Sequence, residues 1–158
     1  MATAIVEQLA TALQATLEAV TTDNGYAVTV SEVTRPTRTG VEASPANYGI
    51  VLLASERTRE REYDRMGAPP AIAWRQTFSI DLYLRVSESS ETPIDTLAHQ
   101  FETAVVQAVM SDRTHGGLAI DTELAGTEYM APGEGYEGCA VLVDVIYRVA
   151  ENDPTSRV

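Results

Sequence analysis

The stretch IAWRQTFSIDLYLRV, residues 72–86, alternates apolar and polar side chains over its length. The large apolar residues share one parity: Ile72, Trp74, Phe78, Ile80, Leu82, Leu84 and Val86. Successive side chains of a strand point to opposite faces, so the pattern predicts a long strand with one buried face. Most strands have about five or six residues. We therefore expect this one to project beyond its sheet together with a neighbouring strand.

Two other segments have the apolar spacing of amphipathic helices. In residues 3–20, apolar side chains recur every three or four positions: Ile5, Leu9, Leu13, Leu17 and Val20. Thr3 is expected to cap the start of this helix. Asn24-Gly25 predicts a turn in the connection that follows.

The second helix is predicted to begin near Thr92. Thr92 would be its N-cap, Pro93 its first residue and Asp95 the partner in an approximate capping box. Its apolar stripe consists of Ile94, Leu97, Phe101, Val105 and Val109. Gly116-Gly117 is expected to end the connection after it.

Five further segments are predicted as strands or loops. Residues 26–33 alternate like a strand, and residues 48–55 form a strand that is apolar on both faces at 50–53, which suggests a central or doubly covered position. Residues 118–124 and 139–149 also alternate. The glycine-rich residues 126–138 between them are either a loop or a bulged strand.

The predicted order is helix, three strands, helix, two strands. This order favours an α+β fold, a two-layer sandwich with both helices on one face of a mostly antiparallel sheet of about five strands. A length of 158 residues is that of one domain, and we expect a single domain over 1–158 with a short polar tail at 151–158.

The charge of the chain restricts its partners. It has 23 acidic and 11 basic residues, all of the latter Arg, and a net charge of −12. Such a chain is poorly suited to wrapping nucleic acid, although an acidic surface would let DNA slide past. Residues 50–54 are the longest aliphatic run, too short for a membrane span, and the first 34 residues contain no cation. We therefore expect no secretory signal and a protein made in the cytoplasm.

The residue types needed for catalysis or metal binding are sparse. His99 is expected on a helix surface and His115 in a turn, and neither stands in a Gly-x-Ser-x-Gly or His-Glu-x-x-His motif. The single cysteine, Cys139, excludes an intramolecular disulfide and is expected to be a buried small side chain. Asp121 and Glu123 are expected on a solvated sheet face. The sequence therefore predicts no catalytic, cofactor-binding or metal site.

Four charged residues occupy the more polar parities of two long strands. They are Asp81 and Arg85 in the first strand, and Asp144 and Arg148 in the last. Cross-strand ion pairs would explain them. A sheet face that meets another subunit would explain them equally well.

The most distinctive segment is ERTREREYDR, residues 56–65, called the charged arm below. It holds four Arg and four acidic residues and has no hydrophobic period. It is either a solvated loop or a subunit contact, placed as the second arm of a protruding hairpin with residues 72–86. The predicted interface residues are Arg57, Arg59, Glu60, Arg61, Glu62 and Arg65, followed by Glu151, Asp153 and Arg157 in the tail. In an extended arm, the arginines at 57, 59 and 61 would project to one side and the glutamates at 60 and 62 to the other.

Several short features occur in a recognisable order. The first helix leads into Asn24-Gly25-Tyr26, and a strand ends near Arg35-Pro36. The closing strand contains Tyr147-Arg148 and runs into a polar tail with Asp153-Pro154. In this arrangement the chain resembles the tail terminator (tail completion) proteins of long-tailed bacteriophages.

The resemblance implies a structural virion protein and no enzymatic activity or cofactor. Such subunits form a hexameric ring on the last ring of the tail tube, stop tube polymerisation and present a surface to the head. The implied partners are a second copy of the chain, the tail tube protein and a head-completion or neck protein. DNA would pass through the lumen without specific binding, and the protein would assemble in the host cytoplasm and reside at the head–tail junction.

Two alternatives remain open. A neck protein or a tail tube subunit of a phage would also use a long strand and a charged arm. A small ligand-binding domain or enzyme would need a pocket in which polar groups converge. The available residues for that are His99, Cys139, Tyr129 and Tyr136.

Overall fold

The computed structural model describes residues 2–36, 47–86, 89–133 and 136–158. Within these residues the elements are α1 (Ile5–Glu18), the 3-10 helix η1 (Thr22–Asn24), β1 (Glu32–Thr34), β2 (Tyr48–Arg59), the 3-10 helix η2 (Arg61–Tyr63), β3 (Ala71–Arg85), α2 (Ile94–Ser111), β4 (Asp121–Gly133) and β5 (Tyr136–Ala150). The strands form one sheet in the order β1-β2-β3-β5-β4. β1 is parallel to β2, and the other neighbours are antiparallel.

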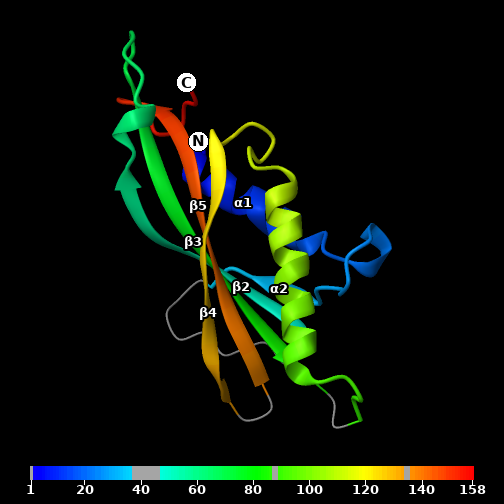
Figure 1. Cartoon of the computed structure of the whole chain (residues 1–158). Helices are drawn as coiled ribbons and strands as arrows, with labels where there is room; N and C mark the ends of the chain where they lie inside the picture. The colour runs from blue at the N-terminus through cyan, green and yellow to red at the C-terminus, as the bar shows by residue number, and fades with distance from the viewer. Residues whose placement is uncertain (1, 37–46, 87–88, 134–135) are drawn as a thin grey trace.

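Both α-helices cover the same face of this sheet (Figure 1). The predicted α+β class and the predicted order of helices and strands are therefore confirmed. No helix among the described residues is long and apolar enough to cross a membrane.

The core lies between the helices and the central strands β3 and β5. Phe78, Ile80 and Leu82 of β3 are buried there, as the alternation of residues 72–86 predicts. β5 runs antiparallel beside β3 over its full length and adds Val141, Val143 and Val145. The helices contribute the predicted stripes, with Leu9, Leu13 and Leu17 of α1 and Phe101, Val105 and Val109 of α2 all buried. Ile94, predicted for the same stripe, is exposed because it begins the helix.

The predicted strand at residues 26–33 is wrong except at its end, since β1 spans only Glu32–Thr34. After η1, the Tyr26 amide bonds back to the Thr21 carbonyl, and the Val30 amide bonds to the Val20 carbonyl. These bonds hold the chain in an irregular path next to the end of α1. Val28 and Val30 are nevertheless buried in the core. The alternation of apolar and polar residues therefore reflects which side chains are buried, although residues 26–31 are not part of a strand. The turn at Asn24-Gly25 is confirmed, with Gly25 at a φ of 88°.

The predicted helix caps are also wrong. α1 begins after Ala4 without a side-chain cap, and the Ile5 amide instead donates to the Pro154 carbonyl. Pro93 is the N-cap of α2, one position before its predicted place, and no side chain caps the helix there. The Asp95 carboxylate accepts from the next amide, that of Thr96, in place of a capping box.

Two strands extend further than the apolar pattern indicates. β2 continues past Ser55 to Arg59 because, after a bulge, its polar residues still pair with β3. The glycine-rich segment after Leu124 continues β4 with two bulges, so the bulged-strand alternative is the right one for residues up to 133. β2 lies between β1 and β3, where Ile50, Val51 and Leu52 are buried but Leu53 is 37% exposed.

Replacing Phe78 by Ala should lower the free energy of unfolding by about 3–5 kcal/mol, because the ring is fully buried and its removal leaves a cavity. The measurement is urea denaturation followed by circular dichroism. Met66→Ala is the matched control, since Met66 is 96% exposed and its loss should change stability by less than about 0.5 kcal/mol. Equal losses in the two variants would contradict this position of the core.

Candidate assembly interface

The charged arm belongs to a hairpin that extends beyond the helices. Past the bulge, Arg57, Thr58 and Arg59 pair with Gln76, Arg75 and Trp74 of β3. The predicted pairing of the arm with residues 72–86 is thus confirmed as far as Arg59. The chain then turns through η2, and two backbone hydrogen bonds of 3.0 Å between Arg65 and Ala71 close the hairpin tip, residues 66–70. Figure 1 shows this tip projecting beyond the end of the sheet.

The turn at η2 changes the side-chain pattern predicted for an extended arm. Arg57 and Arg59 lie on the same side of β2, as expected, with Glu60 on the other. Arg61 does not continue the series because residues 61–63 form a 3-10 turn. The prediction of three arginines in one row is therefore wrong at its last member.

Arg57 and Arg59 are held by neighbours within the same chain. The guanidinium of Arg57 lies 4.8 Å from the centre of the Trp74 ring, a cation–π contact. Arg59 forms a salt bridge of 2.8 Å with Asp64. The other Asp64 oxygen accepts the Ala73 amide at 2.8 Å, and this hydrogen bond, followed by the one from Arg59, lowers the pKa of Asp64. These contacts fix the conformation of the arm.

Arg75 of β3 joins the arm to the sheet on the face away from the helices. Its guanidinium contacts three carboxylates, those of Glu60 (2.7 Å), Glu123 (2.6 Å) and Asp144 (3.1 Å). The hydrogen bonds that Arg75 donates to Glu123 and Glu60 raise its pKa, so it stays charged throughout the accessible pH range. Arg75 was not among the residues predicted for the site, although its place on the polar parity of the long strand was visible in the sequence.

Three predicted interface residues stay directed to solvent. Arg61, Glu62 and Arg65 are exposed and take part in no salt bridge among the described residues. Met66, the next residue, is 96% exposed. The outer part of the hairpin therefore offers charges and one apolar side chain that the folded chain does not use.

The tail residues predicted as a second contact lie at the same end of the molecule. The Glu151 amide donates to the Pro70 carbonyl at 2.9 Å, which joins the tail to the hairpin tip. The Asp153 carboxylate accepts the hydroxyl and amide of Thr155, which lowers its pKa. The Arg157 guanidinium lies over Gly117, where a Cβ would come within 3.2 Å of it. Asp153 thus stabilises the turn of the tail, and Arg157 lies against the glycine turn that follows α2.

Cross-strand ion pairs explain only one of the four charged residues on the long strands, and the alternative of a subunit contact stays a prediction. Asp144 pairs with Arg75 and not with Arg85 or Arg148. Arg148 donates to the Tyr63 carbonyl at 2.7 Å and so supports η2. Asp81 accepts a hydrogen bond from the Ser79 hydroxyl. Among the described residues, Asp144 is thus the one member of this set of four with an ion pair to another strand, and its arginine lies outside the predicted set.

Asp121 and Glu123 share a sheet face as predicted, and each is paired with an arginine. Asp121 binds Arg113 at 2.7 Å, and Glu123 binds Arg75. Among the described residues, no group of three or more His, Cys, Asp or Glu side chains is arranged to hold a metal ion.

Three of the four residues that an enzyme or ligand-binding domain could use, His99, Tyr129 and Cys139, lie near one another. The ring of His99, on the exposed surface of α2, lies edge-on to Tyr129 at 6.3 Å between centres. The Tyr129 hydroxyl donates to Glu102, and this bond raises the pKa of the tyrosine. Cys139 is opposite Tyr129 in the sheet but is buried, as predicted. Tyr136 lies in β5, and its side chain is outside the described part of the structure.

His115 lies in the predicted turn. Most turn residues are exposed, but the His115 side chain is only 6% exposed. Its Nε2 is 2.9 Å from the Thr122 hydroxyl, which itself donates to the Arg113 carbonyl. A hydroxyl has one proton, so Thr122 must accept from Nε2–H. The neutral imidazole therefore carries its proton on Nε2, and burial lowers its pKa.

No protein-family model matches this sequence, and no curated protein matches it significantly. The candidate interface is the hairpin held by these internal contacts, with Arg61, Glu62, Arg65 and Met66 exposed on its outer surface.

Replacing Arg75 by Gln should destabilise the fold by about 1–2 kcal/mol, because three carboxylates then face one another without a cation. It should also speed hydrogen exchange at the Glu60 amide, since Glu60 loses its anchor. Denaturation and hydrogen exchange monitored by NMR give the two values. Arg85→Gln is the control and should leave both unchanged. An unaltered exchange rate in Arg75→Gln would show that the guanidinium does not hold the arm.

The stability of the chain should fall as the pH drops below about 6.5. Burial depresses the pKa of His115 from 6.5 in the folded state, although Asp112 opposes this in part, so the unfolded chain takes up the proton first. The loss is at most about 1.4 kcal/mol per pH unit and ends below the folded-state pKa. Urea denaturation between pH 8 and about 5 should show a weaker pH dependence in His115→Asn than in the unmodified chain. Identical profiles for His115→Asn and the unmodified chain would contradict the prediction.

Proposed function

We propose that this chain is a structural subunit of a ring at the head-proximal end of a bacteriophage tail, where it ends tail tube polymerisation and provides the surface for head attachment. The observation that carries the proposal is the rigid hairpin with unused charges at its outer end. Ordered side chains that remain unpaired within a subunit are available to a partner, and charge pairs between partners set register and specificity.

The fold also supports this proposal. The two-layer α+β arrangement is the one that the resemblance to tail terminators implies, with the hairpin and the tail at one end. A contact between this end and a different surface of the next copy is head-to-tail, and head-to-tail contacts give rings when the rotation closes. A hexameric ring is the form that the resemblance implies.

The mechanism we propose is geometric and uses no cofactor. One face of the ring covers the last ring of tail tube protein, and the other meets a head-completion or neck protein. The net charge of −12 suits a lumen through which DNA must pass without being retained. The protein would act at the head–tail junction of the virion after assembly in the host cytoplasm.

A tail tube subunit is the second candidate, and the length of β3 and its hairpin favours it equally. The two functions differ in assembly, since a tube subunit stacks without limit and a terminator stops at one ring. An enzyme or ligand-binding domain has less support, because Cys139 is buried and His99 and Tyr129 lie exposed on the surface.

Negative-stain imaging with light scattering tests the function. We expect closed rings of the unmodified chain that do not stack. The double variant Arg61→Glu and Arg65→Glu should stay folded, because neither arginine has a salt bridge within the described part of the chain, but it should lose the rings. Arg85→Glu, a charge reversal at the other end of β3, is the control and should assemble normally.

Other outcomes of this experiment are also informative. If the protein forms long tubes, the proposed function as a terminator is wrong and the protein is a tail tube subunit. If the double variant forms rings as stable as those of the unmodified chain, the charged arm is a solvated loop and not a subunit contact. If the unmodified chain is a monomer, it should be incubated with purified tail tubes, and a chain that neither binds the tube ends nor forms rings is not a terminator.

A further inference from the structure

The tail, residues 151–158, is folded back on the end of β5. The Ala150 amide donates to the Ser156 carbonyl at 3.0 Å, and the Asp153 amide donates to the Ala150 carbonyl at 3.1 Å. The Asp153 carboxylate closes this turn, because its Oδ1 accepts both the amide (2.9 Å) and the hydroxyl (2.6 Å) of Thr155. An aspartate that bonds the backbone two residues further on commonly fixes a turn. The conformation of the tail therefore depends on the Asp153 side chain.

The folded tail supplies a partner that the start of α1 lacks. The first amides of a helix have no acceptor within the helix, and no side chain caps α1 at Ala4. The Ile5 amide instead donates to the Pro154 carbonyl at 3.1 Å. Ile5 is buried, so its amide would be costly to leave without a partner. The first turn of α1 is therefore held by the tail.

The same tail holds the hairpin tip. The Glu151 amide donates to the Pro70 carbonyl at 2.9 Å, and Pro70 directly precedes Ala71, whose two backbone hydrogen bonds with Arg65 close the hairpin. The tail and the hairpin lie at the same end of the molecule (Figure 1). Met66, which is 96% exposed, is the residue after Arg65. The tail thus joins the start of α1 to the segment that carries the exposed residues of the candidate interface.

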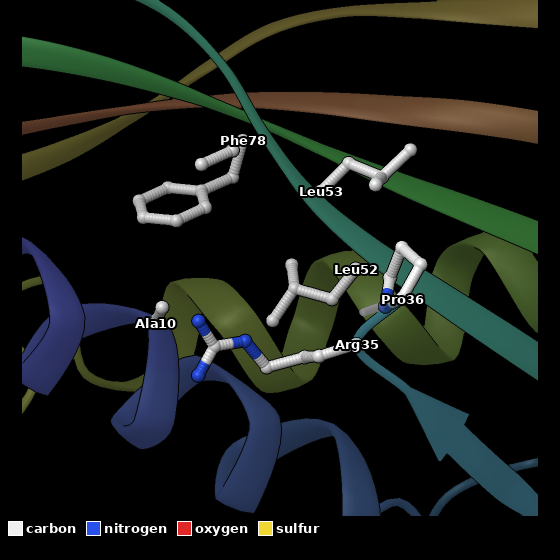
Figure 2. Close-up of a pocket in the computed structure, with 7 residues that line it drawn as sticks. Ala10, Arg35, Pro36, Leu52, Leu53 and Phe78 are labelled. Atoms are coloured by element: carbon white, nitrogen blue, oxygen red, sulfur yellow. The ribbon is translucent and has the colours of Figure 1, made fainter. Parts of the chain in front are cut away.

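A second anchor of α1 does not involve the tail. A pocket of about 440 Å³ lies between Ala10 of α1 and the sheet residues Leu52 and Phe78. Figure 2 shows the Arg35 side chain at this pocket, reaching from the end of β1 toward α1. Its guanidinium binds the Glu7 carboxylate at 2.8 Å. Both partners of this salt bridge lie outside the hairpin and the tail, so the pair provides an independent comparison.

We infer that the tail positions the hairpin tip for its partner, and that Asp153 is the positioning residue that keeps the tail folded. A loop that is already ordered loses less conformational entropy when it binds. The inference rests on the proposed function, because it states how the subunit holds its contact surface in place. It also gives the predicted tail contact a different role, since Asp153 acts on the hairpin through the turn and does not itself touch the partner.

Hydrogen exchange monitored by NMR tests the inference in the separate subunit. Asp153→Ala removes the acceptor of the Thr155 amide and hydroxyl, so the turn should open and release its backbone partners. The amides of Ile5, Arg65 and Ala71 should then exchange at least about fivefold faster than in the unmodified chain. The amide of Phe78, in the centre of the core, should be unchanged, which distinguishes this effect from a general loss of stability.

Two control variants sharpen the experiment. Asp153→Asn removes the charge but keeps a side-chain oxygen that accepts from Thr155, so its exchange should match that of the unmodified chain. Arg35→Gln removes the other anchor of α1 and should leave the amides of Arg65 and Ala71 unchanged. If Asp153→Ala does not speed exchange at these two amides, the tail does not position the hairpin and the inference is wrong.

Assembly of the same variants separates positioning from direct contact. Asp153→Ala should raise the protein concentration needed for rings at least about fivefold, whereas Asp153→Asn should assemble like the unmodified chain. If Asp153→Asn loses the rings although its exchange is unaltered, the carboxylate is itself a subunit contact and the inference is overturned.

Failure of the proposed function gives a different result. If Asp153→Ala speeds exchange as expected, but the unmodified chain forms neither rings nor complexes with tail tubes, the tail still holds the hairpin tip and the proposed function is wrong.

Discussion

The structure depends on the two-sided character of β3. One parity of the strand is apolar and is buried beneath the helices, whereas the other is polar and holds Arg75. That guanidinium contacts carboxylates from β4, from β5 and from the charged arm, so a single side chain connects four parts of the molecule. An arginine suits this position because its planar fork can donate to several oxygens at once.

This arrangement explains why the charged arm is ordered despite having no apolar residues of its own in the core. Arg57 is stacked on Trp74, Arg59 is bound to Asp64, and Glu60 is bound to Arg75. Exposed ion pairs contribute little singly, but a linked set can select one conformation of a loop. These contacts hold the backbone that carries Arg61, Glu62 and Arg65, whose side chains remain exposed.

The sequence was informative wherever a local pattern determines the structure. The alternation of residues 72–86 predicts β3 because a buried face must recur every second residue, and the helical stripes are equally local. Residues 26–33 have the same alternation but form no strand, since periodicity reports burial and does not specify a hydrogen-bond partner. The cap predicted for α1 failed because the Ile5 amide donates to the carbonyl of Pro154, a residue about 150 positions away in the sequence.

The candidate site was predictable only in part for the same reason. The composition of residues 56–65 indicates a charged hairpin, but Glu123 and Asp144 lie 48 and 69 residues from Arg75, and no spacing rule connects them. The burial of His115 is likewise set by its contact with Thr122 across the turn. Contacts within the arm decide which predicted interface residues remain available, leaving Arg61, Glu62 and Arg65.

The most direct measurement is hydrogen–deuterium exchange of the unmodified chain at low and high concentration, where the subunits are separate and assembled. If the hairpin forms the contact between copies, the amides of residues 60–68 should become protected as assembly proceeds, while the core stays unchanged. If assembly protects other surfaces and leaves the exchange of the hairpin unaltered, the hairpin is not the contact that builds the ring.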